Sequence, residues 1–150
     1  MAPGKGFVLG PGEGESVWSL GARFTVKAGT SNAGPRLAVV EALAFRATEP
    51  PLHIHHNEDE AWYVLDGQMS FHVDGKVLVA ASGSFAFAPM GLPHTFTVDI
   101  EPTRVLVFAT PAGFERFAME LGVPAISDEP PPGLSVPAPD VLGPVGARYG

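Results

Sequence analysis

The sequence predicts an all-β fold, a sandwich or a barrel, on the strength of two observations. Runs of strand length with apolar or alternating character recur between residues 17 and 109. Turn signals rich in Gly, Pro, Asn and Asp divide these runs, as Asp66-Gly67 and Asp74-Gly75 do. Short strands at this spacing are typical of all-β domains. The predicted strands cover residues 17–27 with a break at Gly21, 36–46, 61–65, 68–73, 76–80, 85–88, 94–98 and 104–109.

The length of 150 residues is enough for one domain with its own core. We divide the chain into an irregular lead-in over residues 1–14, a main domain over residues 15–122, and a tail over residues 123–150. The main domain ends in one short helix, for which Thr110 is the expected N-cap and Gly122 the expected stop. The tail carries seven prolines, so we expect it to be extended; partial disorder and a path across the barrel or across a neighbouring molecule both remain open.

For the predicted strand over residues 36–46, the alternation of large and small side chains predicts which face is buried. One of its two faces carries larger apolar side chains and the other carries mostly small ones, so we expect the larger set to face the core: Leu37, Val39, Leu43 and Phe45. Glu41 shares that face and therefore needs a partner. We expect an ion pair with Arg23, Arg36 or Arg104; the alternative is a role beside the cavity, as a general base or in support of a ligand.

Composition excludes several classes of function. The net charge of -7 argues against a nucleic-acid-binding surface and against binding to an anionic membrane. The absence of cysteine excludes disulfides, thiolate nucleophiles and zinc-finger sites. No apolar run approaches the roughly 20 residues of a membrane span, and the first residues lack the apolar core of a signal peptide. We therefore expect a cytoplasmic protein.

Several side chains able to bind a metal or to transfer a proton occur together in residues 53–67, HIHHNEDEAWYVLDG. In an extended strand His53 and His55 lie on one face, and Glu60 follows after a short polar turn. Two imidazoles and a carboxylate suit a divalent metal. We assign the remaining polar residues of this stretch to the turn and the rim of the site, namely His56, Glu58 and Asp59. His72 alternates with apolar neighbours and is expected to face outward.

The second half of the chain completes a two-part pattern. His53, His55, Glu60 and Gly67 have the spacing H-x-H-x4-E-x6-G, and Gly83, Pro89, Gly91 and His94 have the spacing G-x5-P-x-G-x2-H. Together they resemble the two characteristic motifs of the cupin superfamily. The fifteen residues between Gly67 and Gly83 resemble the short spacing of small bacterial cupins described as quercetin-dioxygenase-like. The resemblance covers residues 37–109, and it departs from the family pattern at Ala47 and Val98.

The resemblance implies a jelly-roll β-barrel, here with one short C-terminal helix and a proline-rich tail. It also implies that His53, His55, Glu60 and His94 bind one divalent metal inside the barrel. Three imidazoles and one carboxylate are compatible with Fe, Mn, Ni, Zn or Cu. Cupins of this kind are often dimers, so the resemblance makes a homodimer the expected assembly.

The side chains around the expected site indicate its ligand. Trp62, Met69, Phe85 and Phe96 are the expected substrate-binding wall, in addition to their place in the core. Neither Lys nor Arg occurs in residues 52–73 or 84–98, so a basic clamp for phosphate is not expected. A small apolar or aromatic molecule that chelates the metal fits this wall better.

Three functions remain open at this point. The first is a metal-dependent dioxygenase, in which Glu60 also takes a proton from the substrate. The second is an oxygen-independent isomerase or lyase that uses the same metal. The third is a non-catalytic module that binds a small molecule, since one scaffold serves many chemistries.

Overall fold

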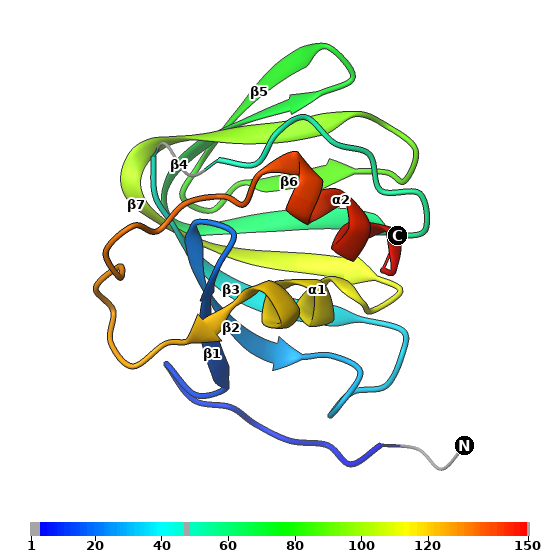
Figure 1. The fold of residues 1–150 in the computed structure, drawn as a ribbon, viewed down its shortest axis with the longest axis vertical. Coiled ribbons are helices and arrows are strands. Elements are labelled where there is room, and N and C mark those ends of the chain that lie inside the picture. Colours follow the sequence, from blue (N-terminus) through cyan, green and yellow to red (C-terminus); the bar gives the residue numbers. More distant parts are fainter. Residues whose placement is uncertain (1–3, 47–48, 150) are drawn as a thin grey trace.

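The computed structural model describes residues 4–46 and 49–149 of the chain. Residues 4–14 contain no helix or strand. In the described part, seven strands come before the first helix, and only the two-residue strand β8 follows it (Figure 1). This arrangement confirms the predicted all-β class. The strands are β1 Glu15–Ser19, β2 Ala22–Ala28, β3 Ala38–Ala44, β4 Asp59–Val73, β5 Lys76–Ala81, β6 Phe85–Ala88, β7 His94–Thr110 and β8 Val123–Pro124, and the helices are α1 Phe114–Leu121 and α2 Pro139–Ala147.

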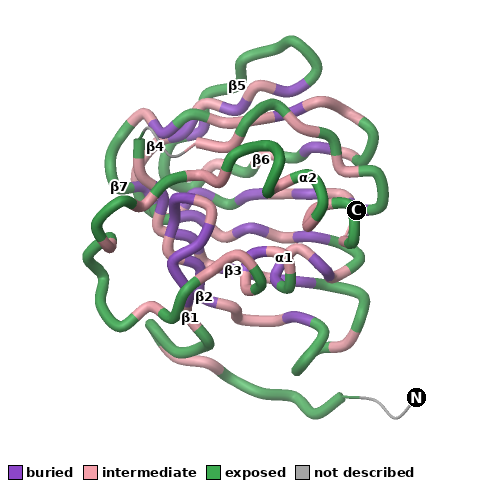
Figure 2. The backbone as a smooth tube through the Cα atoms, viewed as in Figure 1, coloured by how far each residue is buried: buried purple, intermediate pink, exposed green. Residues whose placement is uncertain are grey.

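The strands form one antiparallel sheet in the order β5-β4-β7-β3-β2-β1-β8, with β6 paired to β4. This sheet curls around a single core, because β1 to β7 and α1 all contribute buried apolar side chains to one cluster. Figure 2 shows the buried positions along the inner side of the strands. The non-sequential strand order is that of the expected jelly-roll barrel.

The long strand β4 reverses its inward-facing parity at Gly67. Trp62 and Val64 are buried before this point, and Met69 and Phe71 are buried after it. The pairing with β7 shifts register across the same stretch, as it does at a β-bulge. The predicted turn at Asp66-Gly67 is therefore a bulge inside one strand, and the bulge lets both halves of β4 present apolar side chains to the core. The strands predicted at 94–98 and 104–109 are likewise joined into β7.

The predicted orientation of β3 is wrong. Its buried side chains are the smaller set, Ala38, Val40, Ala42 and Ala44. Small residues on the inner face leave room for a cavity, whereas Val39 and Leu43 lie on the outer face. Phe45 follows the end of β3 and lines the cavity, so this one member of the predicted set does face inward. Glu41 also lies on the outer face, where Arg104 Nη2 contacts Glu41 Oε1 at 2.7 Å. The ion-pair alternative for Glu41 is thus confirmed, and no role beside the cavity remains for it.

The C-terminal helices differ from the prediction in two respects: α1 begins later than expected, and a second helix, α2, lies in the tail. Thr110 is the last residue of β7, because it still pairs with Asp59 of β4. The helix α1 begins after Gly113, whose backbone N–H donates to Glu115 Oε2 at 2.8 Å, and it ends at Gly122 as expected. The proline-rich tail is not wholly extended, because it contains the short helix α2.

Among the described residues, no helix combines the length and apolar character needed to cross a membrane.

The bulge at Gly67 should carry a large stability cost when it is substituted. Gly67 has a φ of 113°, and an added Cβ would lie 2.9 Å from Thr103 Cα. We expect Gly67→Ala to lower the free energy of unfolding by about 3 kcal/mol. Gly75→Ala is the matched control, since its φ of 75° is strained but no atom lies within 4 Å of its Cβ; its expected cost is about 1 kcal/mol. Equal losses in urea unfolding would contradict the packing argument.

Candidate metal centre

Four side chains from three parts of the chain meet at one end of the barrel. Glu60 lies on β4, His94 begins β7, and His53 and His55 lie in the irregular segment before β4. One potential ligand atom from each of them lies within 4.8 Å of the others. The backbones of His53 and His94 exchange two hydrogen bonds of 3.0 and 2.9 Å, which join the two distant segments. All four residues of the expected ligand set are therefore positioned to bind a metal.

Each of the three imidazoles has its Nδ1 engaged by an oxygen outside the cluster. His53 Nδ1 contacts the Pro51 carbonyl at 2.8 Å, and His94 Nδ1 contacts the Leu92 carbonyl at 3.0 Å. His55 Nδ1 contacts Glu58 Oε1 at 2.8 Å. An imidazole that donates its Nδ1–H in this way presents Nε2 to a metal, and metal-binding histidines are usually oriented so. The three rings are thus oriented before any metal arrives.

Glu60 is a buried carboxylate that the histidines keep charged. Burial alone would raise its pKa, but its contacts with His55 and His94 outweigh burial and lower the pKa of Glu60 to about 2. Burial likewise acts to lower the pKa of His55, and contacts with Glu58 and Glu60 raise the pKa of that ring to about 10. Burial lowers the pKa of His53. A metal would replace the proton that His55 carries here, so its binding would release protons.

The buried Nε2 of His55 shows that these residues fit a metal. It lies 3.0 Å from Glu60 Oε2 as an ion-pair contact, yet its geometry there is too poor for a hydrogen bond, and no other described residue supplies one. A buried nitrogen without a hydrogen bond is costly, and a metal ion would satisfy it. The donor set of three nitrogens and one carboxylate suits a first-row divalent ion: Fe, Mn, Ni, Zn or Cu.

Glu58 has a larger role than the sequence indicated. It was expected in a solvated turn, but its exposed fraction is 5% and it contacts His55 Nδ1. A carboxylate at this position orients the ring and raises its basicity. The spacing of three residues between His55 and Glu58 in a tight turn is the signal that could have indicated it. Asp59 is the first residue of β4 and not part of the turn, and its Oδ1 accepts the Met90 N–H at 2.9 Å. His56 is exposed at the cavity edge, outside the ligand set.

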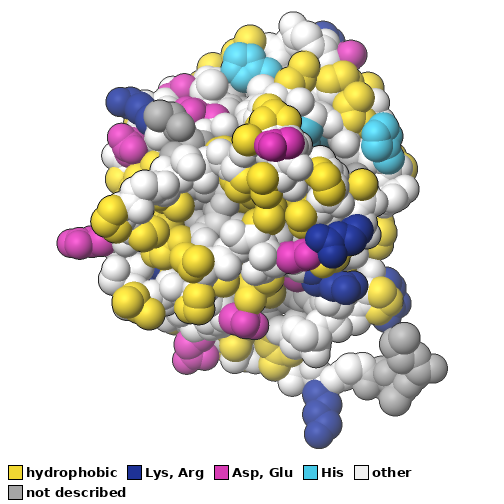
Figure 3. All heavy atoms as spheres, in the orientation of Figure 1, with side chains coloured by type: hydrophobic (Ala, Val, Ile, Leu, Met, Phe, Trp, Pro, Cys, Tyr) yellow, Lys and Arg dark blue, Asp and Glu magenta, His cyan; other side chains and the backbone are white. Residues whose placement is uncertain are grey.

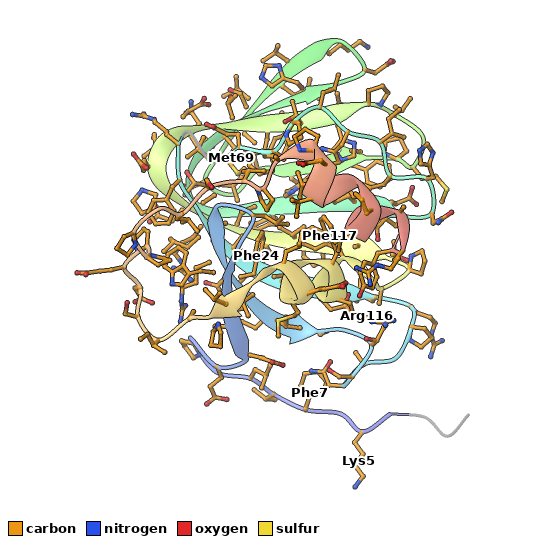
Figure 4. The ribbon with its side chains drawn as sticks, in the orientation of Figure 1. Lys5, Phe7, Phe24, Met69, Arg116 and Phe117 are labelled. Atoms are coloured by element: carbon orange, nitrogen blue, oxygen red, sulfur yellow. The ribbon has the colours of Figure 1, made fainter. Side chains whose placement is uncertain are left out.

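The four residues open into a cavity of about 450 Å³. Trp62, Met69 and Phe96 line it, as expected, and Figure 4 labels Met69 together with Phe24 and Phe117, which line it as well. Phe85 does not line it: its exposed fraction is 65%, because β6 turns Ala86 and Ala88 inward instead. The expected role of Phe85 as substrate wall is therefore wrong. Among the described residues, no Lys or Arg lines the cavity.

Metal binding should depend on each member of the ligand set. We expect His53→Ala and His94→Ala to weaken binding by more than about a hundredfold, because each removes a ligand atom that nothing nearby can replace. His72→Ala is the control, since His72 lies on β4 outside the cluster and should bind metal like the unmodified chain. Titration calorimetry and elemental analysis measure affinity and content. Unchanged binding in His94→Ala would refute the site.

The contact between Glu58 and His55 predicts a smaller, graded effect. Glu58→Gln keeps the size of the side chain but removes the charge, so we expect metal affinity to fall about 10- to 100-fold. Asp59→Asn is the neighbouring control, because its amide oxygen can still accept the Met90 N–H. Equal affinities for the two variants in the same titration would show that the charge on Glu58 does not support the metal.

Comparison with known proteins agrees with this geometry. Residues 40–109 match the family model described as Cupin domain. Quercetin 2,3-dioxygenase of Bacillus subtilis is 28% identical over 126 residues, which are 84% of this chain but 37% of that enzyme. The chain thus spans little more than a third of the length of that relative.

Two solved structures show the same fold. An RmlC-like cupin from Shewanella frigidimarina has a TM-score of 0.63 at 19% identity, over 77% of this chain and 99% of that one. The Streptomyces nucleoside dehydratase Pac13 has a TM-score of 0.60 at 17% identity, over 83% and 96%. Barrel topology, candidate ligand geometry and family match agree: residues 40–109 match the cupin domain, and the fold is that of a cupin barrel.

Proposed function

We propose that this cupin is a metal-dependent dioxygenase that acts on a small apolar or aromatic molecule able to chelate the metal. One observation carries the proposal: a cluster of three histidines and one glutamate lies at the end of an otherwise apolar cavity. Among the described lining residues, the ionisable groups gather around the metal cluster apart from the Tyr149 hydroxyl, so a ligand would place its oxygen atoms there and its apolar body in the remaining volume. A volume of about 450 Å³ is in the usual range for small-molecule sites.

The similarity to a quercetin 2,3-dioxygenase supports this direction. That enzyme is named for a reaction on a flavonol, an aromatic molecule with neighbouring oxygens suited to chelation. The absence of Lys and Arg among the described lining residues disfavours phosphorylated substrates. Because the match spans 37% of the relative, the reaction itself rests on the cavity and the ligand set.

Each residue of the site has a separate task in this proposal. His53, His55 and His94 hold the metal, which when bound supplies open positions for chelation and a redox-capable or Lewis-acid centre. Glu60 completes the ligand set and accepts the proton of the substrate hydroxyl; its pairing with histidines keeps it ionised, which is the form a base requires. Trp62, Met69 and Phe96 hold the apolar body and exclude water.

A homodimer remains part of the proposal, in keeping with the expectation from the resemblance. Phe85 is directly opposite Tyr63 in the pairing of β6 with β4, and both are exposed, as is Phe87. An exposed aromatic group of this kind on an outer sheet face is typical of an interaction surface. Light scattering of the purified protein measures the assembly, and a monomer at all concentrations would contradict it.

Oxygen uptake tests the reaction. Metal-free protein would be loaded anaerobically with Fe(II), Mn(II), Ni(II), Zn(II) or Cu(II) and mixed with flavonols or 1,3-diketones in an oxygen electrode. We expect uptake with at least one redox-active ion, and at least about a hundredfold slower uptake per bound metal for Glu60→Gln, because the amide cannot accept the proton. His72→Ala should keep the full rate.

The outcome also separates the three functions. Absence of uptake with every metal would refute the dioxygenase. Turnover that continues without oxygen would assign the site to an isomerase or lyase, and ligand retention without turnover would assign it to a binding module.

A further inference from the structure

The C-terminal segment of residues 136–149 forms one wall of the metal cavity. The segment contains α2, which lies beside α1 across the open side of the strands (Figure 1), and Figure 3 shows apolar side chains gathered over this face. The strands supply the metal end of the cavity, and the two helices supply much of the remainder. The residues of the segment that line the cavity are Val136, Pro139, Leu142, Gly143, Gly146, Ala147 and Tyr149.

We propose that this segment determines which ligands the site accepts, by closing the end of the cavity away from the metal with an uncharged, largely apolar wall. The inference rests on the proposed function, since it takes the metal cluster as the place where the ligand is chelated. It assigns the ligand class more closely: an uncharged aromatic body joined to one chelating end.

The chemistry of the wall supports this class. Six of its seven lining residues carry no polar side-chain atom, and the phenylalanines of α1 that line the cavity, Phe114 and Phe117, are also apolar. The hydroxyl of Tyr149 is already used, because it donates to Glu120 Oε2 at 2.8 Å. A charged group on the ligand would therefore lose its hydration at this end and find no partner. Flat apolar groups gain contact area there without that cost.

The position of the wall depends on contacts with α1 more than on its own sequence. The helix α2 has nine residues, with Pro144 inside it, and no side chain caps its first turn. Such a short helix is unstable alone. Its end is held by Glu120 of α1, whose Oε1 lies 2.5 Å from Arg148 Nη2 and whose Oε2 accepts from Tyr149. The guanidinium of Arg116 also lies 5.3 Å from the centre of the Tyr149 ring.

Gly143 is the position in the wall at which a substitution can change the cavity volume. It lines the cavity, and an added Cβ would meet no atom within 4 Å. Gly143 is exposed and borders this open space, so a large side chain can be added there without striking the protein backbone, and whatever part of it enters the cavity reduces the volume left for the ligand. Val141 lies on the same helix, is 46% exposed and does not line the cavity, so it offers a matched site for the same substitution.

Two chelators of different size test the wall in zinc-loaded protein, in which zinc carries no redox chemistry. Quercetin carries a flat three-ring body beyond its chelating oxygens, whereas acetylacetone is little larger than its chelating group, so only quercetin is expected to reach the wall. We expect Gly143→Phe to weaken quercetin binding by about tenfold or more and acetylacetone binding by less than about twofold. Val141→Phe should leave both affinities within about twofold of the unmodified chain. Binding would be followed by absorption titration, with zinc content and circular dichroism as checks on the site and the fold.

Weakening the contacts between α1 and the C-terminal segment provides a second test. Glu120→Gln removes the charge that holds Arg148, and we expect quercetin to dissociate faster, about threefold or more, with zinc content unchanged. Full quercetin affinity in folded, zinc-loaded Gly143→Phe would overturn the wall, and so would failure of the unmodified protein to bind quercetin. The dioxygenase proposal fails separately, if quercetin binds as described but no metal supports oxygen uptake.

Discussion

One buried carboxylate, Glu60, is the group on which the rest of the site depends. A charge in this position would be very costly without partners, and His55 and His94 each contact Glu60 Oε2 at 3.0 Å. Those rings are in turn oriented by oxygens behind them, from Glu58 and from the Leu92 carbonyl. Since the groups come from segments far apart in the sequence, the site exists only when the backbone bridge between His53 and His94 has formed.

The strand β4 contributes both to this polar cluster and to the apolar interior, because the set of its residues that faces inward changes from even-numbered to odd-numbered positions along its length. In β4, Glu60 and Trp62 face inward before the bulge at Gly67, and Met69 faces inward after it. A strict alternation would have turned one of these halves to solvent. The bulge thus allows a single strand to supply both a metal ligand and the wall of the cavity, at the cost of a position that only glycine fits easily.

The cavity itself is a property of the packing and not of any one element. Ala42 and Ala44 of β3 place small side chains where larger ones would fill the barrel, and the segment of residues 136–149 covers the space that they leave. Close-packed interiors rarely hold voids of this size unless a ligand occupies them. The strands and the segment before β4 thus place the four candidate ligands, and the helices cover the cavity beside them.

The sequence by itself determined the all-β class, because strand lengths and turn signals are visible along the chain, and its resemblance to the cupin motifs singled out the four candidate ligands His53, His55, Glu60 and His94. Only the tertiary structure decided which face of β3 is buried, since both faces carry apolar side chains and the larger ones lie on the outer face together with Glu41. It also decided that Glu58 contacts His55, because the path of a turn is not encoded in periodicity. The helix α2 escaped prediction for a related reason: its Pro and Gly content opposes a helix locally, and contacts with α1 and the barrel hold it in place.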